Sequence, residues 1–174
     1  MDASDQVTVI SNDDKAFTIL PAVAQMSRTL KNLIEAGAVG AIPCSDVNGK
    51  TLERVVEWCM KHKDDPAEAP ALGGAAPGTA VTDAAAFADF KPAEISEDDK
   101  KMFEPLSQEA LFEVILAANY LEIPKLLDTC CRITANSVLG KTPKEIYAQF
   151  GVEKELTPEE EEEVRKDNPW LEDN

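Results

Sequence analysis

The sequence predicts an α+β protein, with a few short strands in its N-terminal part and helices in the rest of the chain. Three features indicate this class. Residues 7–20, "VTVISNDDKAFTIL", combine β-branched residues with an Asn-Asp-Asp turn, amphipathic helical spacing follows, and capped helical segments fill the last third. The chain has 174 residues, 44% of them hydrophobic, which is enough for a buried core. We therefore expect one domain, with or without an appendage.

The front elements follow from local signals. Residues 7–20 are expected to form two short strands about a turn at 12–14. Ser27 can cap a helix that runs through Glu35 and ends at Gly37. Residues 41–47, "AIPCSDV", are expected to be a short extended piece. Residues 49–63, "GKTLERVVEWCMKHK", have the apolar spacing of an amphipathic helix.

The composition changes between Asp64 and about Pro92. This stretch is rich in Ala, Pro and Gly, and its prolines interrupt any long helix. We interpret it as a mobile loop or linker, with a short Ala-rich helix at 83–90 as an open alternative.

Behind the linker the chain is helical. Ser107 can cap residues 108–123, "QEALFEVILAANYLEI", which are apolar nearly all round and are expected to lie inside the protein. Pro124 can open the next helix, which Gly140 ends. Thr142 to Glu145 form a capping box that opens a short helix closed by Gly151.

The segment "TPEEEEEVRKDNPW", residues 157–170, repeats this capping box but offers one valine to bury. A disordered tail is one interpretation, because high charge and low hydrophobicity favour disorder. The capping box and the i, i+4 ion pairs favour a helix that orders when a partner covers Val164 and Trp170.

The net charge and the motifs of the chain limit the classes of function that it can have. A net charge of −16 argues against nucleic acid and anionic membranes and favours protein partners with basic patches. The N-terminal residues "MDASDQ" do not resemble a signal peptide, and the spacing of the four cysteines fits neither a disulfide framework nor a metal site. No catalytic motif, cofactor or small-molecule substrate is indicated.

Two features could carry chemistry. His62 is the single histidine, and we expect it to be exposed near a helix C-terminus, where it favours the helix dipole. The pair Cys130 and Cys131 is expected to line a core or a groove, with a small redox protein as the alternative.

Four stretches resemble a known family: "WCMKHKDDP", "LFEVILAANYLEI", "GKTPKEIYAQFGV" and "TPEEEEEVRKDNPW". They are similar to the Skp-type adaptor of Skp–cullin–F-box (SCF) ubiquitin ligases, in collinear order over roughly Val7 to Asp65 and Met102 to Trp170. The resemblance implies a BTB/POZ fold at 6–139, with a flexible insertion at about 64–98, and C-terminal F-box-binding helices at 140–174.

The resemblance also implies a function without catalysis: the adaptor holds a cullin on one side and an F-box protein on the other, in the cytoplasm and nucleus. The implied cullin-binding positions are Ile42, Pro43, Asn119 and Tyr120. The implied F-box-binding positions are Leu127, Cys131, Val138, Ile146, Phe150, Val152, Leu156, Val164 and Trp170. From the residues alone, Asn119 in an apolar helix fits a structural hydrogen bond equally well.

This sequence departs from the family pattern in places. The loop is Ala/Gly-rich where the family has an acidic one, and Asp99 stands where the family has a tryptophan. "CCRITANSVLG" also differs, which could alter the preference among F-box proteins. Pro143 matches a proline that some lineages modify. The alternative function is a cullin-independent scaffold for F-box proteins in kinetochore or trafficking complexes.

Overall fold

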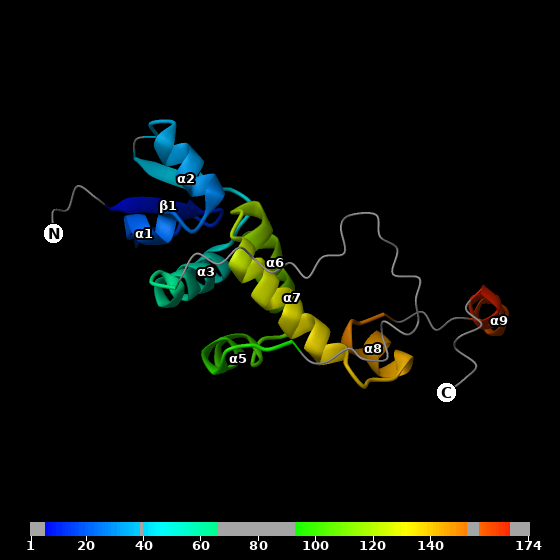
Figure 1. The fold of residues 1–174 in the computed structure, drawn as a ribbon. Helices are drawn as coiled ribbons and strands as arrows, with labels where there is room; N and C mark the ends of the chain where they lie inside the picture. Colours follow the sequence, from blue (N-terminus) through cyan, green and yellow to red (C-terminus); the bar gives the residue numbers. More distant parts are fainter. Residues whose placement is uncertain (1–5, 39, 66–92, 153–156, 168–174) are drawn as a thin grey trace. The chain divides into compact units, whose positions relative to one another are not determined.

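The computed structural model describes residues 6–38, 40–65, 93–152 and 157–167, and Figure 1 labels their helices and the strand β1. The described residues fall into two compact units, with residues 6–65 and 93–135 in the first and residues 136–152 and 157–167 in the second. Residues 66–92, which make up nearly all of the linker predicted from Asp64 to about Pro92, lie outside the described residues, as do its alternative helix and the predicted contacts Leu156 and Trp170.

The first unit begins with a three-stranded sheet. It consists of β1 (Val7–Ser11), β2 (Ala16–Ile19) and β3 (Ala41–Cys44), in the order β2-β1-β3. The predicted hairpin is confirmed, because β1 and β2 pair antiparallel, with Val9 opposite Phe17. The predicted extended piece is β3, which pairs parallel with β1 so that Val9 faces Ile42. Val9, Ile19, Ile42 and Cys44 are buried.

The next helices are α1 (Pro21–Ala24), α2 (Arg28–Glu35) and α3 (Gly49–His62). Ser27 caps α2 as predicted, since its hydroxyl accepts a hydrogen bond from the Leu30 amide. Among the apolar residues of α2, Leu30 is buried, whereas Leu33 and Ile34 are 40% and 37% exposed. The side chain of Asn48 caps α3 by accepting from the Thr51 amide.

The start of α3 lies close to the β1–β2 turn. Asp13 Oδ1 accepts hydrogen bonds from the Gly49 amide at 2.6 Å and from the Ser11 hydroxyl at 2.6 Å. A Cβ at position 49 would lie 2.4 Å from Lys15 Cδ and 2.8 Å from Asp13 Oδ1, so a larger residue there would displace these two side chains.

Three further helices complete the first unit: α5 (Glu97–Phe103), α6 (Gln108–Tyr120) and α7 (Pro124–Val138), whose last residues belong to the second unit. The sequence did not predict α5. Helix α6 packs against α3, and the core there includes Trp58, Val114 and Leu126, each 0% exposed. Glu113 holds α6 to the start of α3, because its carboxylate accepts hydrogen bonds from Asn48 Nδ2 at 3.2 Å and from Thr51 Oγ1 at 2.9 Å.

The second unit contains α8 (Pro143–Gln149) and α9 (Pro158–Asp167). The predicted capping box of α8 is confirmed, with both reciprocal hydrogen bonds between Thr142 and Glu145. Gly151 ends the helix at φ 66°, as predicted. The Val152 amide then donates to the Tyr147 carbonyl at 2.9 Å, which turns the chain back over the last turn of α8.

Candidate partner-binding surfaces

The outward side of α6 carries large apolar side chains. Phe112 is 39% exposed and Leu116 is 68% exposed, and the Asn119 side chain is also exposed. Together with Tyr120 these residues fall at i, i+4, i+7 and i+8, which is one side of a helix. We call Phe112, Leu116, Asn119 and Tyr120 the α6 face.

The prediction that α6 lies wholly inside the protein is therefore wrong. Leu111, Val114, Ala117 and Ala118 are buried, so one side of α6 builds the core and the opposite side does not. Phe112 and Leu116 were missed as site residues. Their spacing from Asn119 was a usable signal, because a polar residue in an apolar helix indicates the side that faces away from the core.

The surroundings of Asn119 also bear on its role. Its side chain makes no hydrogen bond within the part of the chain that the structure describes, so the alternative of a structural hydrogen bond gains no support there. Tyr120 is half-buried, and its backbone carbonyl accepts from the Thr29 hydroxyl at 3.1 Å. The end of the α6 face is thus anchored to the start of α2.

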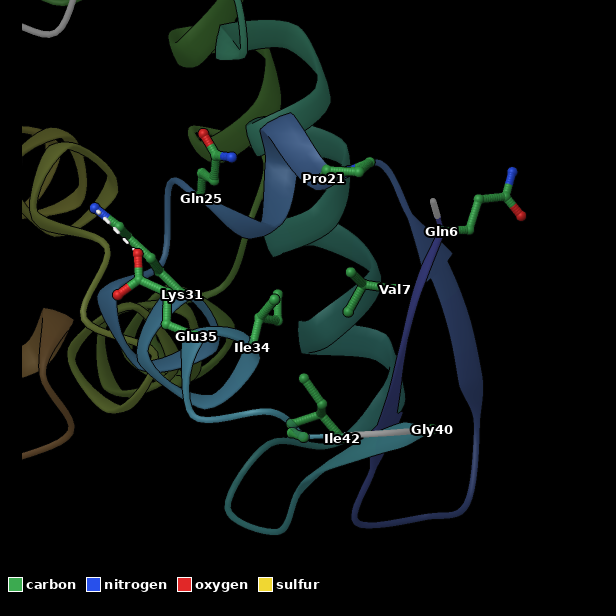
Figure 2. Close-up of a pocket in the computed structure, with 10 residues that line it drawn as sticks. Gln6, Val7, Pro21, Gln25, Lys31, Ile34, Glu35, Gly40 and Ile42 are labelled. Atoms are coloured by element: carbon green, nitrogen blue, oxygen red, sulfur yellow. Dashed lines mark ion pairs between the residues drawn. The ribbon is translucent and has the colours of Figure 1, made fainter. Parts of the chain in front are cut away.

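The other two predicted cullin-binding residues lie on β3. Pro43 is exposed, whereas Ile42 is 5% exposed and points to the buried side of the strand. Ile42 also borders a cavity of about 460 Å³. Figure 2 shows Val7, Ile34 and Ile42 around this cavity, with the ion pair between Lys31 and Glu35 at its edge.

Two predicted F-box-binding residues lie on the part of α7 that belongs to the first unit. Leu127 is half-buried and packs against the core, and Cys131 is exposed. Its neighbour Cys130 is fully buried. The pair was expected to line a core or a groove: Cys130 lies in the core, whereas Cys131 lies at the surface.

The second unit holds the predicted F-box-binding residues that the structure describes beyond Ala135. Val138, Ile146 and Phe150 are half-buried. Val152 is 47% exposed and Val164, on α9, is 42% exposed. The capping box predicted for α9 is present, because the Thr157 amide donates to Glu160 Oε2 at 2.9 Å and the Glu160 amide donates to Thr157 Oγ1 at 3.3 Å.

The thiols are poorly suited to nucleophilic chemistry. Burial raises the pKa of Cys59 to about 12, and burial together with the nearby Cys131 and Asp99 raises the pKa of Cys130 to about 12. Partial burial and the carboxylate of Asp128 raise the pKa of Cys131. A raised pKa reduces the thiolate fraction at neutral pH, so this site does not resemble a redox centre.

The predicted exposure of His62 is wrong. Its side chain is 14% exposed and stacks on Trp58, with ring centroids 4.2 Å apart. Its two ring nitrogens contact Asp65 and Asp99. The expectation of exposure rested on the position of His62 near a helix end. Its contact Asp99 is 37 residues away in sequence, so local sequence does not reveal it.

Within the described ranges, no helix combines the length and apolar character needed to cross a bilayer. Over the same residues, no group of three or more histidine, cysteine and carboxylate side chains is placed to hold a metal ion.

Comparisons with known proteins identify the family. Residues 5–64 match the model of the Skp1 family, tetramerisation domain, and residues 124–171 match that of the Skp1 family, dimerisation domain. The chain is 42% identical to "E3 ubiquitin ligase complex SCF subunit sconC" of Arthroderma otae, over 98% of this chain and 97% of that protein. Proteins of the same name in Talaromyces stipitatus and Aspergillus terreus are each 40% identical, over 98–99% of this chain and 99–100% of theirs.

Proposed function

The chain belongs to the Skp1 family, and from this premise we propose that it is the adaptor subunit of an SCF-type E3 ubiquitin ligase. Its front unit has the POZ fold of that family, a small mixed sheet packed with helices. The adaptor joins a cullin to F-box proteins and performs no catalysis itself. The raised pKa values of its thiols are consistent with this non-catalytic role.

The α6 face is the observation that carries the cullin side of the proposal. A leucine that is 68% exposed on a helix whose opposite side is core has apolar surface available to a partner. Asn119 adds an amide with no internal partner among the described residues, which can hydrogen-bond across an interface. Pro43, exposed on β3, extends the proposed contact, and Ile42 supports it from the buried side.

The F-box side is proposed for the residues of α7, α8 and α9 that the family resemblance indicates. Exposed Val152 and Val164 and half-buried Ile146 and Phe150 supply apolar surface in the second unit, and Leu127 and Cys131 supply it on α7. We extend the proposal to Leu156 and Trp170 from the sequence. Helix α9 has one apolar side chain among its ten residues, so it gains little by folding alone and much by docking.

The net charge and the free cysteines support the proposed kind of partner and the proposed cellular location. The net charge of −16 suits partners with basic surfaces. All four cysteines are free, which suits the reducing cytoplasm and nucleus, where we propose that the protein acts.

Two variants separate the proposed sides. The double substitution Asn119→Ala with Tyr120→Ala is expected to weaken binding of a cullin N-terminal domain and to leave F-box binding unchanged. Truncation after Gly151 is expected to do the opposite. Each is measured by titration calorimetry with the purified cullin domain and with an F-box peptide.

A matched control is Met60→Ser, because Met60 is a 46% exposed apolar residue of α3 that belongs to neither set of proposed contact residues. It is expected to leave both affinities unchanged. If the intact chain bound F-box proteins but no cullin, the cullin-independent scaffold would replace the adaptor role. If the truncated chain kept full F-box affinity, the assignment of the F-box side would be wrong.

A further inference from the structure

His62 joins two carboxylates that lie on different elements. Its Nδ1 is 2.7 Å from Asp65 Oδ2, just beyond α3, and its Nε2 is 3.0 Å from Asp99 Oδ1 on α5. Asp65 precedes residues 66–92 and Asp99 follows them, so this histidine links the two ends of that stretch. We call His62, Asp65 and Asp99 the His62 bridge.

The number of ring protons decides whether both contacts are hydrogen bonds. A carboxylate only accepts, and a neutral imidazole has one N–H and one lone pair. With a neutral ring, one carboxylate oxygen therefore faces a lone pair at hydrogen-bonding distance, which is repulsive. Both contacts are favourable together when the ring carries two protons.

The surrounding donors keep both carboxylates in the accepting role. Lys125 of α7 donates to Asp65 Oδ2 at 2.5 Å, and Lys125 and His62 together hold the pKa of Asp65 below its ordinary value. Asp99 accepts from Trp58 Nε1 at 2.7 Å and from the Ser96 hydroxyl at 2.7 Å. The bonds to Asp65 favour its carboxylate form, and the two donors to Asp99 each need an acceptor oxygen there.

The stack on Trp58 favours the same state. The rings of Trp58 and His62 are nearly parallel, with an interplanar angle of 25°. A cationic ring over the face of an indole is attracted by its π electrons, and the attraction is larger where water is largely excluded. Trp58 is 0% exposed and the His62 side chain is 14% exposed, so water is scarce here.

We propose that the His62 bridge is a proton-dependent clasp that fastens α5 to the C-terminal end of α3. The doubly protonated ring makes both bonds, and loss of one ring proton removes one of them and loosens α5. The charged groups facing the ring are Asp65 at the end of α3 and Asp99 on α5, with Lys125 of α7 paired to Asp65. The clasp is therefore closed on the acidic side of the ring's titration and opens as pH rises.

The test uses the free full-length protein, because the chain has one histidine and ring-labelled histidine reports His62 alone. NMR on 15N-histidine protein follows the ring as pH is raised. Hydrogen exchange follows the α5 amides over the same range, including the Glu104 amide that donates to the Lys100 carbonyl. After correction for intrinsic exchange rates, the proposal predicts that α5 protection falls several-fold at the midpoint of the ring's titration.

Two variants sharpen this test. Asp99→Asn keeps an oxygen for the Trp58 indole but removes the charge that faces the ring, so the corrected protection of α5 is expected to lose most of its dependence on pH. His62→Gln is expected to make the corrected protection of α5 independent of pH, and the neighbouring Lys61→Gln is the matched control that keeps the response. Constant α5 protection while the wild-type ring titrates would overturn the proposal. So would an undiminished pH response of α5 protection in the Asp99→Asn protein.

Discussion

Replacement of Leu116 by alanine separates a partner-binding side chain from a core one. Full burial of a leucine side chain contributes about 1.5–3 kcal/mol. Leu116 is 68% exposed, so a partner that covers it gains roughly two thirds of that value, about 1–2 kcal/mol. Because 1.4 kcal/mol corresponds to a factor of ten, Leu116→Ala is expected to raise the cullin Kd about 5–30-fold. Its free energy of unfolding should change by less than about 0.5 kcal/mol.

The assay pairs titration calorimetry against a cullin N-terminal domain with urea unfolding of the free protein. Leu111→Ala is the matched control, because Leu111 is 4% exposed on the same helix. A buried leucine truncated to alanine costs about 2–5 kcal/mol of stability. If Leu116→Ala destabilised the protein as much as Leu111→Ala and left the cullin Kd unchanged, Leu116 would be a core residue and not a cullin contact.

Three further predictions concern stability and reactivity. Trp58→Phe removes the indole donor to the nearly buried Asp99 carboxylate, so urea unfolding should show a loss of at least about 1.5–3 kcal/mol; a change below about 0.5 kcal/mol would contradict the hydrogen bond. The folded pKa of Asp65 is lowered, chiefly by Lys125, so their interaction stabilises the fold above about pH 3.9 and is lost as pH falls. Urea unfolding at a series of pH values measures the difference in stability between the wild type and Lys125→Met. This difference should disappear at acidic pH, where Asp65 is protonated. A difference that persists at acidic pH would show that another interaction is responsible. Iodoacetamide at about pH 8 should alkylate Cys131 first, as followed by intact mass, with the three buried cysteines reacting after denaturation; early reaction of a buried cysteine would contradict the burial described here.

Helix starts and ends could be predicted from the sequence because their causes are local. The caps Ser27, Ser107 and Thr142 each accept a hydrogen bond from an amide three residues on, and that partner is fixed by the chain itself. Gly140 and Gly151 have positive φ after helices, as glycine after a periodic segment indicates.

Features that depend on distant residues could not be predicted in this way. The parallel pairing of β3 with β1 brings together residues about 30 positions apart, and "AIPCSDV" itself specifies no partner strand. The two sides of α6 are similarly apolar in sequence, and only packing against α3 decides which side is buried. The setting of His62 depends on Asp99, a residue of the unpredicted helix α5.

Of the candidate site, the sequence supplied positions by family resemblance but not their exposure. Asn119 and Val152 lie at the surface, whereas Ile42 lies in the core beside the cavity. Phe112 and Leu116 entered the α6 face only once the exposed side of the helix was known.

The central claim is that one copy of this chain holds a cullin and an F-box protein at the same time, through separate surfaces. Native mass spectrometry of the three purified components, at concentrations above both dissociation constants, tests it most directly. We expect a single complex containing one copy of each component. Two binary complexes with no ternary species, each partner displacing the other, would contradict it.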